Sequence, residues 1–139
     1  MLKGINPLVG PDLLQALAAM GHGDQIVIAD RNFPSHRIGQ RVVEMRGHDA
    51  PTVVAVICEL LPLDLSVRQP VLRMKTDDGD LPEVHVEVMD VVAPILRGDQ
   101  SIGEVERFDF YDRAGQAYLV VVTGESRPYG DFILTKGVI

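Results

Sequence analysis

The order of apolar segments predicts an α/β fold, in which helices cover both faces of a mainly parallel sheet in three layers. Segments with helical periodicity alternate along the chain with short apolar segments of strand length. Residues 26–29 (IVIA) are all apolar, as expected of a central strand that is buried on both faces. The chain has 139 residues, 46% of them hydrophobic, which suits one domain with a full core. We therefore expect a single domain over residues 1–139.

The first helix is predicted at residues 11–20 (PDLLQALAAM). Pro11 suits the first helical position, where its missing N–H leaves no hydrogen bond unmade. Leu13 and Leu17 then fall on one face of the helix. Gly21 follows directly and is typical of a residue that ends a helix.

The other elements follow from the same patterns. Further strands are expected at residues 41–45 (RVVEM), 71–75, 118–123 (YLVVVT) and 132–136, and further helices at 51–61 (PTVVAVICELL) and 105–115. Residues 82–97 fit two patterns, because the valines at every second position from 84 to 88 alternate as in a strand, whereas the apolar residues from 88 to 95 recur as in a helix. We interpret this segment as a helix, because Pro82 can begin one.

The charge of the chain excludes some partners. Lys and Arg number 13 against 20 Asp and Glu, which gives a net charge of −7. A nucleic-acid surface needs a basic stripe, so we expect no nucleic-acid partner. The apolar runs are too short to cross a bilayer and the start of the chain (MLKGINPLVG) has no pattern of a secretory signal, so we expect a cytoplasmic protein without a membrane partner.

The segment MGHGD, residues 20–24, contains the first candidate for chemistry. His22 lies between two glycines, which leave space for a ligand beside the imidazole. Asp30 ends the strand at 26–29, and ligands of open α/β sheets bind at the carboxyl ends of strands. A carboxylate near an imidazole fixes its tautomer and stabilises its charged form. We hypothesise that the strand brings Asp30 to His22; the alternative is a helix end with a solvated histidine and a turn aspartate, Asp24.

Two further segments contain groups that bind hydroxyls. In ERFDFYDRA, Arg107 and Tyr111 are four residues apart and would share a helix face, where a guanidinium and a phenol suit hydroxyl groups. The alternative is a salt-bridged surface helix with Phe108 and Tyr111 packed inward. The segment RPYGD at 127–131 predicts a turn before the final strand, which is either a binding loop or a plain turn.

No spacing of residues predicts a metal site. His22, His36, His48 and His85 are not paired at ligand spacing, and the single cysteine, Cys58, cannot form an internal disulfide. His48 and His85 lie among charged residues and are expected at the surface. The residues alone therefore predict a histidine-centred pocket with hydroxyl-binding groups, without a named reaction.

Similarity to a known family extends over nearly the whole chain. It is carried by LKGINPLVGPDLLQALAAMGHGDQIVIAD at the start, NFP at 32–34, ERFDFYDRA at 106–114, TGES at 123–126 and YGDFILTKGV at 129–138. In this order the segments resemble the fucose mutarotase and ribose pyranase family, and more closely its fucose mutarotase branch. The resemblance implies an enzyme that interconverts the anomers of a free reducing monosaccharide, most closely L-fucose, without metal or organic cofactor.

The resemblance also implies roles for particular residues. His22 would be the catalytic acid and base, and Tyr111 would lie near the sugar. The groups that hold the sugar hydroxyls would be Asp30, Arg107 and the loop formed by Tyr129, Gly130 and Asp131. Members of the family assemble as ring-like homo-oligomers, commonly decamers, in which a neighbouring subunit completes each pocket.

The chain departs from the family pattern at one of these positions. The family usually has asparagine where this chain has Asp131, and an ionised carboxylate only accepts hydrogen bonds whereas an amide also donates. Arg107 matches the fucose branch, since the ribose branch tends to have histidine there. Three alternatives stay open: a ribose-type pyranase that interconverts pyranose and furanose forms, a non-catalytic sugar-binding or regulatory module, and a sugar isomerase or epimerase.

Overall fold

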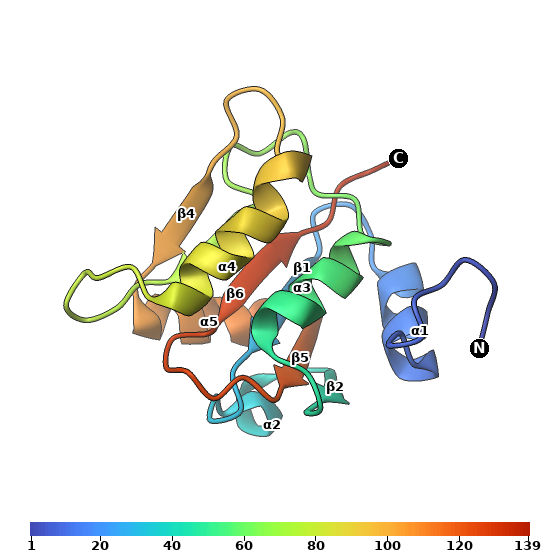
Figure 1. The fold of residues 1–139 in the computed structure, drawn as a ribbon, viewed down its shortest axis with the longest axis horizontal. Coiled ribbons are helices and arrows are strands. Elements are labelled where there is room, and N and C mark those ends of the chain that lie inside the picture. Colours follow the sequence, from blue (N-terminus) through green and yellow to red (C-terminus); the bar gives the residue numbers. More distant parts are fainter.

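A computed structural model describes residues 1–139, and it contains one six-stranded sheet with helices on both faces (Figure 1). The strands are β1 (Gln25–Ala29), β2 (Val42–Met45), β3 (Val71–Met74), β4 (Ile102–Val105), β5 (Leu119–Thr123) and β6 (Phe132–Thr135). The helices are α1 (Pro11–Ala19), α2 (Ser35–Ile38), α3 (Ala50–Cys58), α4 (Glu83–Val92), the 3₁₀ turn η1 (Ala93–Ile95) and α5 (Arg107–Gln116). The predicted α/β class is confirmed.

The sheet is mainly parallel, as predicted, and has the strand order β2-β5-β1-β6-β3-β4. Parallel pairs join β2 to β5, β5 to β1 and β3 to β4. Strand β6 is antiparallel to both of its neighbours, β1 and β3. The carboxyl ends of the parallel strands therefore meet at one edge of the sheet, together with the amino end of β6.

Alternation along the strands builds a core on each side of the sheet. In β1, Ile26 and Ile28 belong to the cluster that packs against α1, α3 and α4, whereas Val27 and Ala29 belong to the cluster that packs against α5. Figure 1 shows α3 and α4 in front of the sheet and α5 behind it. All four side chains are fully buried, which confirms that this strand is central. No helix combines the length and the apolar composition needed to cross a bilayer.

The ambiguous segment at 82–97 is helical, as interpreted, because α4 and the 3₁₀ turn occupy most of it. Two short elements were not predicted, namely helix α2 and strand β4. Helix α2 has four residues, too few for a periodic pattern. Strand β4 has the sequence IGEV, and Gly103 and Glu104 give it a low propensity for strand. Its pairing with β3 therefore comes from tertiary contacts.

Candidate active site

A cavity of about 280 Å³ opens at the edge of the sheet where the parallel strands end. Its walls come from the ends of β1 and β3, the loop before β6, and the first turns of α5. The lining residues are Asp30, Asn32, Phe33, Met74, Arg107, Tyr111, Pro128, Tyr129 and Asp131. Five of the six residues expected to bind a sugar are therefore brought together. The sixth, Gly130, lies in the same loop but packs against Glu125, where an added Cβ would be 2.5 Å from the Glu125 Cγ.

Asp30 is held at the floor of this cavity by its own turn. Its Oδ1 accepts hydrogen bonds from the backbone N–H groups of Asn32, at 2.7 Å, and Phe33, at 2.9 Å. Its own N–H donates to Oδ1 of Asp131, at 2.8 Å. Strand β1 thus delivers a carboxylate with a fixed orientation to the cavity, as expected for a residue at the carboxyl end of a central strand.

Arg107 and Tyr111 share the helix face that closes the cavity, as their spacing predicted. Helix α5 begins here because the Glu106 side chain accepts from the N–H groups of its first turn. The guanidinium of Arg107 lies over the Phe108 ring, with 4.8 Å between its Cζ and the ring centroid, and its buried Nε has no hydrogen-bond partner in the protein. An unpaired buried donor suits an oxygen of a bound ligand. The alternative with Phe108 packed inward is wrong, since that side chain is 62% exposed.

An aromatic wall stands behind these polar groups. The Phe33 ring meets the rings of Phe110 and Tyr111 edge to face, with centroid distances of 5.8 and 5.3 Å. Such contacts fix the orientation of rings at little loss of freedom. The cavity therefore combines a rigid apolar side with carboxyl, guanidinium and phenol groups, a mixture typical of pockets for small polar ligands.

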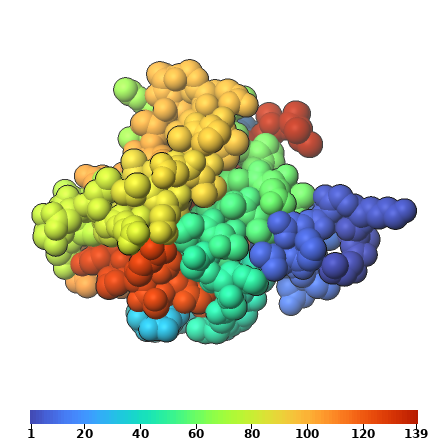
Figure 2. Space-filling view, in the orientation of Figure 1, coloured from blue at the N-terminus to red at the C-terminus, as the bar shows by residue number.

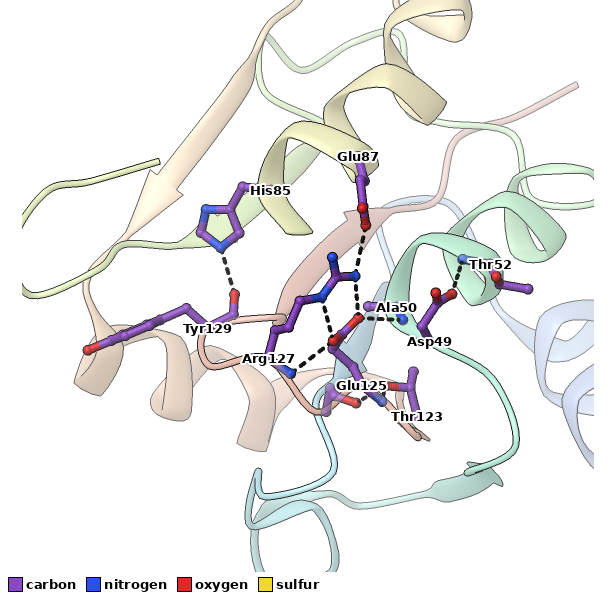
Figure 3. Close-up of polar contacts among 10 residues, drawn as sticks. Asp49, Ala50, Thr52, His85, Glu87, Thr123, Glu125, Arg127 and Tyr129 are labelled. Atoms are coloured by element: carbon purple, nitrogen blue, oxygen red, sulfur yellow. Dashed lines mark hydrogen bonds and ion pairs between the residues drawn. The ribbon is translucent and has the colours of Figure 1, made fainter. Parts of the chain in front are cut away.

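The loop before β6 holds Tyr129 in an unusual backbone conformation. Its φ is +61°, in the left-handed region that disfavours residues with a side chain. The carbonyl of Tyr129 accepts from Nε2–H of His85, at 2.6 Å (Figure 3). Nδ1 of His85 accepts from Arg73, at 3.3 Å. A neutral imidazole satisfies both bonds, because a carbonyl can only accept and a guanidinium can only donate. Burial first, and the charge of Arg73 as well, lowers the pKa of His85.

The expectation that His85 lies at the surface is wrong. Helix α4 turns this residue towards the sheet, where it is fully buried and meets the Phe132 ring edge to face at 5.4 Å. Its charged sequence neighbours lie on other faces of the helix. A count of apolar residues at helical spacing through 84, 88 and 92 would have placed position 85 next to the buried face.

The buried carboxylate of Glu125 stabilises the same loop through hydrogen bonds. Glu125 is 2% exposed and accepts from Arg127 through the backbone N–H and Nε, both at 2.9 Å, and through Nη2 at 3.0 Å. It also accepts from the backbone N–H of Ala50 at the start of α3, at 3.3 Å, while Arg127 reaches Glu87 of α4, at 2.8 Å (Figure 3). Burial alone would raise the pKa of Glu125, but the bonds from Arg127 and Ala50 hold it at about 2. Neither Glu125 nor Arg127 was predicted to support the site.

His22 lies at the other end of β1. It follows α1, and its Nε2 is 3.1 Å from Oδ2 of Asp64, a buried carboxylate. Hydrogen bonds from Ser66 contribute most to lowering the pKa of Asp64, and the hydrogen bond from His22 lowers it further. Burial acts in the opposite direction but is outweighed. The imidazole borders a separate, mostly apolar cavity of about 540 Å³, and its side chain is 52% exposed.

The hypothesis that β1 brings Asp30 to His22 is wrong within one chain. The five residues of β1 lie between them, and a strand of that length spans roughly 17 Å. The glycines also have another role, because Gly23 has a φ of +86° and is required by the turn itself. Asp24 is a turn aspartate, whose Oδ2 accepts from the N–H of Gly21 at 2.7 Å.

Comparisons with known proteins agree with these features. The model of the RbsD / FucU transport protein family matches residues 3–139. An L-fucose mutarotase of Haemophilus influenzae is 42% identical over 140 aligned positions, which cover 99% of this chain and 97% of that protein. An L-fucose mutarotase of Glaesserella parasuis is 43% identical and covers 99% and 96%. The crystal structure of a Streptococcus pneumoniae fucose mutarotase in complex with L-fucose superposes with a TM-score of 0.93, at 36% identity over 99% of each chain.

Proposed function

The chain belongs to the RbsD / FucU family, and we propose that it is a mutarotase, an isomerase that interconverts the α and β anomers of L-fucose. The observation that carries the proposal is the cavity at the carboxyl edge of the sheet. It gathers two carboxyl groups, one unpaired guanidinium N–H and two phenols from segments far apart in the sequence. The similarity to L-fucose mutarotases over nearly the full length supports the choice of sugar.

The chemistry needs a proton donor and acceptor but no covalent intermediate. The anomeric hydroxyl loses a proton while the ring oxygen gains one, and the bond between the anomeric carbon and the ring oxygen breaks. The resulting aldehyde turns its other face to the hydroxyl, and the ring closes with the proton movements reversed. An imidazole, with an ordinary pKa of about 6.5, can carry out both transfers near neutral pH. Such positioned proton transfer contributes roughly 10²–10⁴ in rate.

Each cavity residue has a role that its contacts support. The Asp30 carboxylate accepts from a sugar hydroxyl, since its orientation is fixed by two backbone bonds. The unpaired Nε–H of Arg107 donates to another hydroxyl. The phenols of Tyr111 and Tyr129 donate or accept at the rim, and Gly130 allows the loop to pack on Glu125. His22 is the acid and base.

The distance between His22 and the cavity implies an assembly. Since roughly 17 Å of strand separates them, we propose that His22 of one chain completes the cavity of a second copy in a homo-oligomer. Contacts between opposite ends of a chain are head to tail, and they form rings when the rotation from one subunit to the next closes, which suits the decamer expected from the family resemblance. Exposed apolar residues support such contacts: Val138 and Ile139 border the His22 cavity, and Phe108 stands beside the other. Figure 2 shows the two termini projecting on the same side of the molecule.

Exchange spectroscopy by NMR on equilibrated L-fucose tests the proposal directly. We expect cross-peaks between the α and β anomers that grow with added protein and vanish with His22→Ala. The matched control is His36→Ala, since His36 is an exposed histidine that pairs with Glu44 outside the cavity. If neither L-fucose, D-ribose nor D-galactose shows catalysed exchange, the enzymatic proposal fails and the sugar-binding module takes its place. Exchange of ribose alone, with furanose forms, would instead favour the pyranase.

Mixing two inactive variants tests the shared pocket. His22→Ala and Arg107→Ala should each abolish exchange, because one lacks the proton-transfer group and the other lacks a sugar contact. Mixed oligomers, formed by joint refolding, contain some pockets with both residues intact and should recover part of the activity. No recovery, in mixed oligomers verified by mass spectrometry, would show that one chain supplies both groups. We further propose that the enzyme acts in the cytoplasm.

A further inference from the structure

Two carboxyl groups share the floor of the cavity. Asp30 directly follows β1 and Asp131 directly precedes β6, and these strands pair so that Ile28 lies opposite Phe132. The pairing places the two aspartates side by side, and the N–H of Asp30 donates to Oδ1 of Asp131 at 2.8 Å. Asp131 is 2% exposed and Asp30 is 8% exposed. Water therefore screens the two carboxyl groups poorly from each other.

The surroundings of the pair favour one negative charge rather than two. Two adjacent buried carboxyl groups cannot both ionise easily, so one of them keeps its proton. Oδ1 of Asp30 accepts two backbone N–H groups, from Asn32 and Phe33. The Asp131 side chain receives one backbone N–H, from Asp30. Burial first, and then the charge of Asp30, raises the pKa of Asp131 well above its usual range.

Charged groups on the neighbouring elements do not reverse this preference. Glu125 in the loop after β5 is negative and is occupied by Arg127. On β3 and just beyond it, Arg73 and Lys75 pair with Glu104. The remaining titratable groups that line the cavity are Arg107 and Tyr111 of α5 and Tyr129 of the loop. Arg107 is the one positively charged residue among the lining residues of the cavity.

We propose that Asp131 binds the sugar as a neutral carboxylic acid and determines specificity together with Asp30. The acid O–H of Asp131 donates to the oxygen of one sugar hydroxyl, and the carboxylate of Asp30 accepts the O–H of the adjacent one. The pair presents one donor and one acceptor side by side, which two ionised carboxylates cannot do. This inference rests on the proposed sugar substrate, but the state of the proton can be measured without it.

The proposal predicts the pH dependence of both binding and stability. A folded state that raises the pKa of Asp131 holds this proton more tightly than the unfolded chain does. Its contribution to stability is therefore complete below the ordinary aspartate pKa of about 3.9, and it is lost as the pH rises through the raised value. Over the same rise the donor disappears and a second negative charge enters the cavity, so the affinity for L-fucose falls.

The variant Asp131→Asn tests whether position 131 acts as a hydrogen-bond donor. The amide keeps the shape of the side chain and an N–H donor, but it has no proton to lose as the pH rises. At pH 7 we expect L-fucose affinity within a few-fold of the unmodified protein, measured by calorimetry. On raising the pH, the unmodified protein should lose affinity by about tenfold or more, whereas Asp131→Asn should not. Asp131→Ala, which lacks the donor, should be weak at every pH. Asp109→Asn, an exposed aspartate on α5, should follow the unmodified profile.

Infrared spectroscopy of the full-length protein gives an independent readout. We expect the band of a protonated carboxyl group at pH 7, shifted by labelling aspartate with ¹³C and absent from Asp131→Asn. Absence of that band from the unmodified protein would overturn the proposal, as would a tenfold loss of affinity in Asp131→Asn at pH 7. If L-fucose neither binds nor exchanges, the proposed function fails, while the infrared band still decides where the proton lies.

Discussion

Glu125 offers a sharp test of how the loop before β6 is held, through the variant Glu125→Gln. The folded protein lowers the pKa of Glu125 from 4.5 to about 2, and each pKa unit corresponds to about 1.36 kcal/mol. The charged form therefore contributes about 3 kcal/mol to the free energy of unfolding, similar to the loss seen when one partner of a buried ion pair is removed. Glutamine keeps the size of the side chain but leaves the Arg127 charge without its partner. We expect Glu125→Gln to be about 3 kcal/mol less stable at pH 7.

The pH dependence identifies the cause. A lowered pKa means that the stabilisation is present above the ordinary glutamate value and is lost as the pH falls through the folded value. The difference between the unmodified protein and Glu125→Gln should therefore shrink between pH 4.5 and about 2. Urea unfolding across this range measures it. Asp109→Asn is the matched control, because Asp109 forms an exposed pair with Arg113 that contributes about 0.3–0.5 kcal/mol. A Glu125→Gln loss below 1 kcal/mol at pH 7, or one that is constant with pH, would refute the reasoning.

Three further variants test other supports of the site. His85→Phe removes the donor to the loop carbonyl and should weaken L-fucose binding by about tenfold, measured by calorimetry; unchanged affinity would contradict a positioning role. Asp64→Asn frees the imidazole of His22, the proposed acid and base, and should slow anomer exchange at least tenfold at saturating sugar, with unaltered affinity; an unchanged rate in exchange NMR would exclude this role. Gly124→Ala places a Cβ 2.2 Å from the carbonyl oxygen of Arg46 and should cost about 1–3 kcal/mol in urea unfolding. Gly47→Ala, with nothing within 4 Å, is its control, and equal losses in both variants would contradict the steric explanation.

Periodicity predicted most of the fold, because the buried faces are nearly uninterrupted. The apolar run of β1 and the leucines of α1 need no tertiary information to be recognised. The segment at 82–97 was ambiguous because valine suits both structures, and contact of α4 with α3 and the sheet decides for the helix. Strand β4 was missed because its pairing with β3 outweighs the low strand propensity of Gly103 and Glu104.

The sequence predicted those residues of the candidate site whose positions follow from the end of a strand or the face of a helix. Asp30, Arg107 and Tyr111 are of this kind, and they line one cavity. The position of His22 relative to Asp30 was misjudged, although the length of the strand between them already places them far apart. His85 was misplaced although it adjoins the apolar face formed by residues 84, 88 and 92. Glu125 gave no signal, because a titratable residue of this kind is recognised by its hydrogen bonds and not by its neighbours in sequence.

The position of β6 has a consequence for the synthesis of the chain. This strand follows all the others in sequence, yet it lies between β1 and β3. Without residues 132–135 the sheet consists of two separate parts, β2-β5-β1 and β3-β4, each with an unpaired inner edge. A nascent chain therefore exposes two edges that can pair with other chains until this segment leaves the ribosome. Because Asp131 immediately precedes the segment, the sheet and the cavity at its edge are completed in the same step.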